Sequence, residues 1–169
     1  MKTKPRILPR TYFNRPTLTV ARSLVGKYLV RCIDGKEIAG KIIEVEAYVG
    51  SQDKACHAAK GRTQRTEVMF GPAGFAYVYL IYGMYHCLNV VTEREEFPSA
   101  VLIRAIELNA ELIDGPGRLC RALEIDRRLN RVDLTVGESL WFEDRGGVVG
   151  RGTVGAYPRI GVDYAGMWA

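Results

Sequence analysis

The sequence is poor in cysteine, and its few cysteines limit the settings that suit the protein. Four cysteines lie far apart in 169 residues, and they form no Cys-x-x-Cys motif. The first residues do not have the basic-then-apolar pattern of a signal peptide. This cysteine usage indicates a reduced, intracellular setting.

Long hydrophobic runs are also lacking. The longest apolar stretch, residues 75 to 91, is interrupted by four tyrosines, a glycine, a histidine and an asparagine. This excludes a membrane span and predicts a soluble protein that has no membrane partner. The sequence holds no glycine loop of the Walker or dinucleotide type, no internal repeat and no low-complexity segment. The function therefore has to be inferred from local patterns.

Histidine is scarce as well, and both histidines adjoin a cysteine, in Cys56-His57 and His86-Cys87. Two thiolates and two imidazoles form a set that zinc accepts. Adjacent ligands on a strand point to opposite faces, however, and neither pair has the spacing of common zinc sites. Nothing marks a cysteine as an activated nucleophile either. We therefore expect no metal site here.

The size of the chain indicates the number of domains, and its charge indicates the kind of partner. A chain of 169 residues with 47% hydrophobic and 25% charged residues is expected to form one domain, 1–169, with a basic arm at 1–10 that is laid over the surface or partly disordered. The net charge of +5 and the pI near 9.1 favour an anionic partner such as nucleic acid, although many small basic proteins bind nothing charged.

Periodicity and turn residues predict most of the secondary structure. The pattern predicts a helix over 17–24, a strand pair over 28–32 and 37–50, a long loop over 51–66, a hairpin of strands 75–81 and 85–91, a buried strand over 100–108, a helix over 114–130, and strands over 140–143 and 159–162. The glycine-rich start of the second helix could hold a phosphate or could be an ordinary helix start.

Two glutamates, Glu44 and Glu46, share one face of the predicted strand 37–50. Residues i and i+2 of a strand lie about 6.5 to 7 Å apart. The pair could act together, have separate roles, or simply face solvent. Tyr48 follows on the same face and would form an aromatic wall beside Glu46. This arrangement makes Glu46 the candidate catalytic acid or base of a pocket.

Tyrosines concentrate around the predicted hairpin, where Tyr77, Tyr79, Tyr82 and Tyr85 lie within nine residues. Tyr77 and Tyr79, taken singly, have the pattern of core residues. Tyr82 lies beside Gly83 at the tip of the hairpin, where there is little core to join. Its ring could act as a wedge between stacked bases.

Several long segments together resemble the alkyladenine (3-methyladenine, methylpurine) DNA glycosylase family. The segments are "RSLVGKYLV", "EVEAYVG", "DKACHAAKGRTQRTEVMFGPAGFAYVYLIYGMYHCLNVV", "VLIRAIE", "DGPGRLCRAL" and "IGVDYAGMWA". The resemblance implies an α+β fold, a single mixed domain with a curved, mainly antiparallel sheet, flanking helices and a protruding β-hairpin that enters the DNA minor groove. Members of the family usually continue past the last segment with further basic and aromatic residues.

The resemblance also implies a role for individual residues. It makes Glu46 the general base that activates water, and Arg104 the arginine near this acid and the target phosphate. It places Tyr48, His57 and Tyr79 around the flipped base, Asn89 against the exocyclic amine of guanine, Leu102 on the pocket floor, and Tyr82 with Met84 at the intercalating hairpin tip.

The resulting hypothesis is a monofunctional enzyme of base excision repair. It would act as a monomer without a cofactor on double-stranded DNA that contains damaged purines, in the cytoplasm with the nucleoid of a bacterium or otherwise in a nucleus. Alkylated adenine, hypoxanthine and etheno-adducts all remain open as substrates. Two alternatives are a non-catalytic nucleic-acid-binding module and a nucleoside or glycoside hydrolase that uses the paired glutamates.

Overall fold

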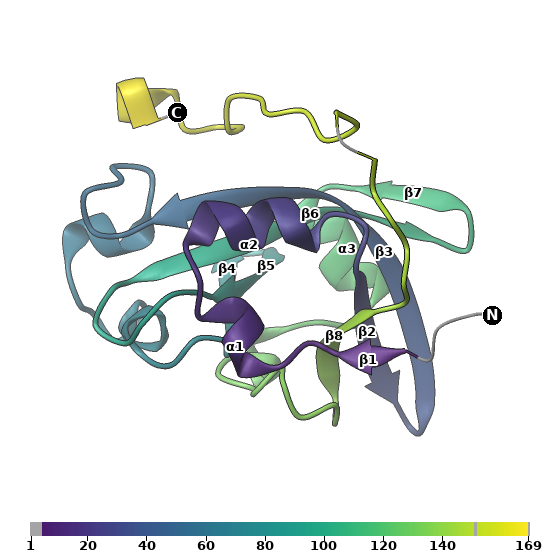
Figure 1. The fold of residues 1–169 in the computed structure, drawn as a ribbon. Helices are drawn as coiled ribbons and strands as arrows, with labels where there is room; N and C mark the ends of the chain where they lie inside the picture. Colours follow the sequence, from purple (N-terminus) through teal and green to yellow (C-terminus); the bar gives the residue numbers. More distant parts are fainter. Residues whose placement is uncertain (1–4, 151, 169) are drawn as a thin grey trace.

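An antiparallel sheet organises the computed structural model, which describes residues 5–150 and 152–168 (Figure 1). The strand order is β1-β8-β2-β3-β6-β5-β4, and β7 pairs with β6 outside this path. The strands are β1 (Arg6–Ile7), β2 (Tyr28–Ile33), β3 (Lys36–Val49), β4 (Ala76–Ile81), β5 (Tyr85–Val91), β6 (Ser99–Leu108), β7 (Glu111–Asp114) and β8 (Leu140–Asp144). The predicted α+β class is confirmed.

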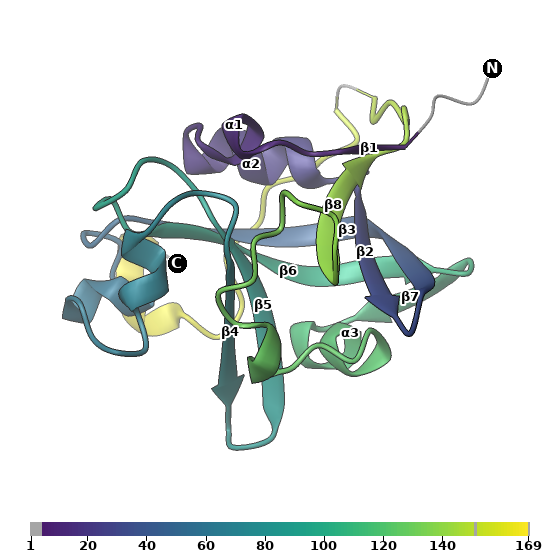
Figure 2. The same cartoon turned by 90° about the horizontal axis from the view of Figure 1, so that it is seen from below.

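Three α-helices and four 3-10 helices complete the secondary structure of the described residues. The helices are α1 (Arg10–Phe13), α2 (Thr17–Leu24), α3 (Pro116–Ala122), η1 (His57–Lys60), η2 (Glu67–Phe70), η3 (Arg127–Leu129) and η4 (Asp163–Trp168). Figure 2 shows the β4–β5 hairpin extending beyond α3 and the rest of the body. None of the helices in these ranges combines the length and the apolar character that a membrane crossing requires.

The second predicted helix is shorter than expected. It ends at Ala122 rather than near residue 130, because Glu124 takes a left-handed conformation (φ 49°) and the Ile125 N–H bonds to the Cys120 carbonyl. This is a common way to end a helix.

The prediction of a strand over 159–162 is wrong, because this stretch has no ladder partner and consists of coil and turn. Strand β7 was not predicted. It returns along β6 through Asn109 and Ala110, both at positive φ (52° and 64°), the geometry of a tight hairpin turn.

The described part of the basic N-terminal arm is laid against the sheet. Arg6 and Ile7 pair with Asp144 and Glu143 of β8, and Leu8 is buried. The first four residues of the predicted arm lie outside the described ranges.

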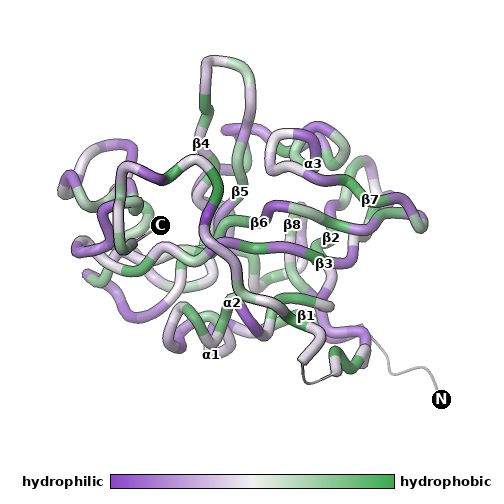
Figure 3. The backbone as a smooth tube through the Cα atoms, turned by 90° about the horizontal axis from the view of Figure 1, so that it is seen from above, coloured by the Kyte–Doolittle hydropathy of each residue, from purple (hydrophilic) through white to green (hydrophobic). Residues whose placement is uncertain are grey.

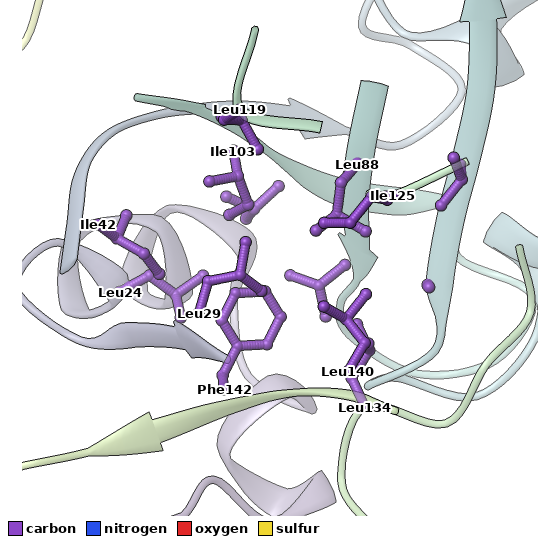
Figure 4. Close-up of a cluster of buried hydrophobic side chains, with 14 of the residues drawn as sticks. Leu24, Leu29, Ile42, Leu88, Ile103, Leu119, Ile125, Leu134, Leu140 and Phe142 are labelled. Atoms are coloured by element: carbon purple, nitrogen blue, oxygen red, sulfur yellow. The ribbon is translucent and has the colours of Figure 1, made fainter. Parts of the chain in front are cut away.

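The main core gathers apolar side chains from segments between Leu8 and Phe142 (Figure 4). Leu24 of α2, Leu119 of α3 and Phe142 of β8 are fully buried in it, together with Leu88 and Ile103 of the central strands. Each buried side chain of this size contributes about 1.5 to 3 kcal/mol relative to an exposed one.

The alternation of side chains along β6 separates this core from a second face. Val101 and Ile103 belong to the main core, whereas Ala100, Leu102 and Arg104 line a cavity on the opposite face. Strands β4 and β5 alternate in the same way, because successive side chains of a strand point to opposite faces. The sheet therefore has one face for the core and one for the cavity.

Candidate active site

The cavity has a volume of about 600 Å³ and brings together eight of the nine predicted site residues. Strands β3 to β6, the loop after β3, the start of α3 and the C-terminal segment form its walls. In Figure 3 the hairpin projects from one side of the molecule, and the C-terminal segment crosses over the sheet. The predicted residues that line the cavity are Glu46, Tyr48, His57, Tyr79, Tyr82, Asn89, Leu102 and Arg104.

Glu46 is the buried carboxylate of the cavity, with its side chain 6% exposed. Its Oε2 accepts a hydrogen bond of 2.7 Å from the Tyr48 hydroxyl, and its Oε1 accepts one of 3.1 Å from the Ile160 N–H. The Arg104 Nε lies 3.5 Å from Oε1. Three groups therefore fix the orientation of this carboxylate.

Glu44 has a different environment from Glu46, although Arg104 contacts both. The Arg104 Nε donates to Glu44 Oε1 over 3.1 Å, so the arginine on the buried strand β6 has its partner here. A register irregularity between Ile42 and Val45 lies in this part of β3. The Glu44 side chain is 46% exposed, so the two glutamates differ in their exposure to solvent.

Aromatic rings form the wall of the cavity beside the loop that follows β3. The His57 ring meets the Tyr79 ring edge-on at a centroid distance of 4.6 Å, and His57 Nδ1 lies 3.0 Å from the Tyr77 hydroxyl. Burial lowers the pKa of His57 to about 4, and the charges of Arg65 and Lys60 act in the same direction. Histidine is therefore neutral here at physiological pH.

The Tyr48 and Tyr79 hydroxyls in the cavity keep their protons at physiological pH. Burial raises the pKa of Tyr48 well above its ordinary value, and the neighbouring Glu46 carboxylate raises it further. Burial also raises the pKa of Tyr79. The site thus combines one buried carboxylate with neutral aromatic groups, an arrangement suited to holding a planar guest beside a base.

Asn89 and Leu102 face each other across the ladder between β5 and β6. Asn89 is buried, and its amide donates to the Tyr77 carbonyl over 3.1 Å. This bond fixes the side chain as a rigid part of the cavity wall.

The tip of the β4–β5 hairpin presents Tyr82 and Met84 to solvent, 84% and 63% exposed. Tyr82 and Gly83 both take positive φ, 53° and 67°, within the three-residue loop that connects the paired residues Ile81 and Tyr85. A tyrosine in this conformation is uncommon. Met84 does not line the cavity, and of the predicted site residues it alone lies outside it.

Sequence reasoning missed a group of residues that closes the cavity from the C-terminal side. Arg159 and Asp53 form a buried ion pair, and Ile160 donates to Glu46. Burial raises the pKa of Asp53, but hydrogen bonds from Arg159, Val49 and Ala55 lower it below its ordinary value overall. The only signal in the sequence was the segment "IGVDYAGMWA", which could not indicate where the tail packs.

The cysteine–histidine pairs do not form a ligand set. Within residues 5–150 and 152–168, no group of three or more His, Cys, Asp or Glu side chains is arranged to hold a metal ion. Burial raises the pKa of the Cys56 thiol to about 11 and also raises that of Cys87. Both groups are therefore neutral thiols at physiological pH.

Comparisons with known proteins find similar sequences over nearly the whole chain. Residues 11–169 match the methylpurine-DNA glycosylase (MPG) family. The chain is 51% identical to a protein of Methanocella arvoryzae, covering 95% of this chain and 86% of that protein. It is 53% identical to proteins of Legionella pneumophila strain Lens (97% and 90% covered) and Myxococcus xanthus (96% and 85% covered). All three bear the provisional name 3-methyladenine DNA glycosylase.

Proposed function

Because the chain belongs to the methylpurine-DNA glycosylase family, we propose that it flips a damaged purine out of duplex DNA and hydrolyses its N-glycosidic bond with water activated by Glu46. The observation that carries this proposal is the position of Glu46, a buried carboxylate inside a cavity walled by Tyr48, His57 and Tyr79. The cavity of about 600 Å³ is large enough for a purine nucleotide.

The aromatic walls support recognition of an alkylated base. An alkylated purine carries positive charge, and a cation gains about 0.5 to 2 kcal/mol against an aromatic face relative to a neutral ring. Extrusion costs least for a damaged and badly paired base. The two effects favour the same substrates. We infer that Tyr82, which is exposed at the tip beside the cavity, fills the gap that the flipped nucleotide leaves; its exposure and position support this role.

The chemical step needs one base and one positioned water. Water attacks the anomeric carbon of the sugar, the carbon–nitrogen bond breaks, and its electron pair leaves with the purine. Glu46 takes the proton of the water, and its negative charge stabilises the developing oxocarbenium ion. The described residues that line the cavity include no lysine, so no amine is at hand for a covalent intermediate. The proposed product is an abasic site in an uncut strand.

The test is excision of defined lesions by Glu46→Gln, with Glu44→Gln as the matched control. Both variants make the same chemical change beside Arg104, but only Glu46 is enclosed in the cavity. Duplexes containing an alkylated adenine, hypoxanthine or ethenoadenine are incubated with protein, and alkali then reveals the abasic sites. Glu46→Gln should lose at least about 10² to 10⁴-fold in rate, the usual contribution of a general base, while it keeps duplex affinity.

Three results would argue against the proposal. Excision by Glu46→Gln at nearly the parental rate would remove Glu46 from the chemistry. A parent protein that binds lesion duplexes without excising any base would be a binding module. Turnover of free nucleosides, undiminished by Tyr82→Ala, would instead favour a nucleoside hydrolase.

A further inference from the structure

The C-terminal segment that lines one side of the cavity is fastened to the loop after β3 by a buried ion pair. Arg159 Nη1 lies 2.7 Å from Asp53 Oδ2, and Nη2 lies 2.9 Å from Oδ1. The two side chains are 12% and 2% exposed. This bidentate geometry is specific to a guanidinium, because an ammonium group offers no planar fork.

Each partner of the pair also holds backbone groups of the site. Asp53 accepts hydrogen bonds of 3.0 Å from the Val49 and Ala55 N–H groups, which fixes the turn after β3. Arg159 Nη1 donates to the Ala47 carbonyl over 2.9 Å. The pair therefore connects the end of β3, the following loop and the C-terminal segment.

Arg159 also contacts the cavity wall directly. Its guanidinium carbon lies 4.8 Å from the centre of the Tyr48 ring. The next residue, Ile160, donates its N–H to Glu46 Oε1 over 3.1 Å. Tyr48 and Ile160 are thus two donors to the same carboxylate. Arg159 contacts the first of them and directly precedes the second in the sequence.

The rest of the C-terminal segment has few other attachments. Residues 152–158 are exposed. Beyond Arg159, Val162 and Ala165 pack against Ala55 and Tyr48 in a small apolar cluster, and residues 160–162 and 164 line the cavity. A closed cavity therefore depends on the ion pair and on this cluster.

We propose that Arg159 and Asp53 are positioning residues for base excision, which hold the wall formed by residues 160–164 closed and keep the Ile160 N–H on Glu46. The proposal rests on the proposed function, because it assigns the pair to the chemical step of that reaction. Loss of one partner leaves the other charge buried without compensation, so the segment would detach.

The test substitutes the arginine and uses a second arginine as a matched control. Arg159→Met keeps an unbranched stem over Tyr48 but removes all donors. Arg145 makes the same kind of contacts elsewhere, since it pairs with the buried Glu143 and lies 4.4 Å over the Tyr28 ring without lining the cavity. Arg145→Met is therefore the control, and Arg159→Lys is the conservative variant that keeps the charge.

Single-turnover excision at saturating protein is measured together with duplex affinity and the unfolding midpoint. Arg159→Met should slow excision about 100-fold, the effect of a small misplacement of reacting groups, with little change in affinity. Arg159→Lys should recover part of the rate, and Arg145→Met should keep it. If Arg159→Met slows excision no more than Arg145→Met does, the proposal is overturned. A lower midpoint with an unchanged rate per folded molecule would also overturn it.

Hydrogen exchange of the Ile160 amide separates this proposal from the proposed function. The amide should be protected in the parent and in Arg145→Met, and it should exchange at least tenfold faster in Arg159→Met. If the parent excises no base but this pattern holds, the proposed function fails and the pair still fastens the wall. An Ile160 amide that is as well protected in Arg159→Met as in the parent would show that the pair does not hold the segment.

Discussion

Tyr48 donates a hydrogen bond of 2.7 Å to Oε2 of Glu46, the residue two positions before it on β3. The aromatic wall and the carboxylate are therefore one unit, built by the two-residue period of a strand. Since the Tyr48 hydroxyl keeps its proton throughout the physiological range, it orients the carboxylate without competing for the proton of a water.

Removal of this hydroxyl should slow excision while stacking is kept. Tyr48→Phe retains the ring, and we expect a rate about 10- to 100-fold lower, because a hydrogen bond to a charged group is worth about 1.5 to 3 kcal/mol. Tyr12→Phe is the control, since its hydroxyl donates to Ser23 over 2.7 Å on the other face of the molecule. Equal rates for the two variants would mean that Tyr48 acts only through its ring.

Tyr82→Ala should weaken DNA binding without unfolding the protein. An exposed substitution usually costs under about 0.5 kcal/mol of stability, whereas loss of base stacking should weaken lesion binding by roughly 1 to 3 kcal/mol. Tyr77, 2% exposed on the same hairpin, gives the contrast: Tyr77→Ala should cost about 3 to 5 kcal/mol of stability. Unfolding midpoints and duplex affinities are measured on the same preparations. A destabilised Tyr82→Ala with unchanged affinity would remove Tyr82 from the DNA interface.

Asn89→Ser should widen the cavity and shift the substrate preference. The shorter side chain no longer meets a substituent on the bound ring, so activity on guanine-type lesions or undamaged purines should rise relative to alkyladenine. The measurement is the ratio of the excision rate on a duplex with a guanine-type lesion or an undamaged purine to the rate on a duplex with alkyladenine. Asn130→Ser, which alters a hydrogen bond to the Val78 N–H outside the cavity, controls for general loosening of β4. An unchanged order of preference would contradict a gating role for Asn89.

His57 should make the stability of the protein depend on pH below neutrality. Its pKa is about 4 in the folded protein and 6.5 in the unfolded chain, so the unfolded state binds more protons between these values and stability falls as pH falls. Between pH 7 and pH 5 this amounts to about 2 kcal/mol. The free energy of unfolding is measured with urea at pH 7 and at pH 5. Its change between the two pH values should be smaller for His57→Gln than for the parent. Equal differences would place the pKa of His57 near its ordinary value.

Much of the fold could be predicted from local pattern. Alternating apolar residues indicated the strands of the β4–β5 hairpin and β6, and Gly83 beside Tyr82 indicated the tip. The two-residue period also indicated that Glu46 and Tyr48 share a face. These features depend on neighbours within a few residues, so the sequence records them directly.

The C-terminal segment shows where local pattern fails. Ile160 and Val162 alternate as in a strand, yet they line the cavity and make no ladder. The Val162 side chain packs against Ala55 and Tyr48, which lie far away in the sequence, whereas Ile160 is 62% exposed. An apolar alternation predicts burial on one face, and it does not specify which surface provides the burial.

The sequence by itself determined most of the elements, the carboxylate beside an aromatic ring, and the exposed tyrosine at a hairpin tip. Only the tertiary structure decided that Arg159 pairs with Asp53, 106 residues earlier, and that Ile160 bonds to Glu46, 114 residues earlier. The physical reason is the distance along the sequence between the interacting residues. Periodicity reflects the geometry of consecutive residues, whereas an ion pair and a hydrogen bond between distant segments exist only after the sheet has curved and the chain has returned across it.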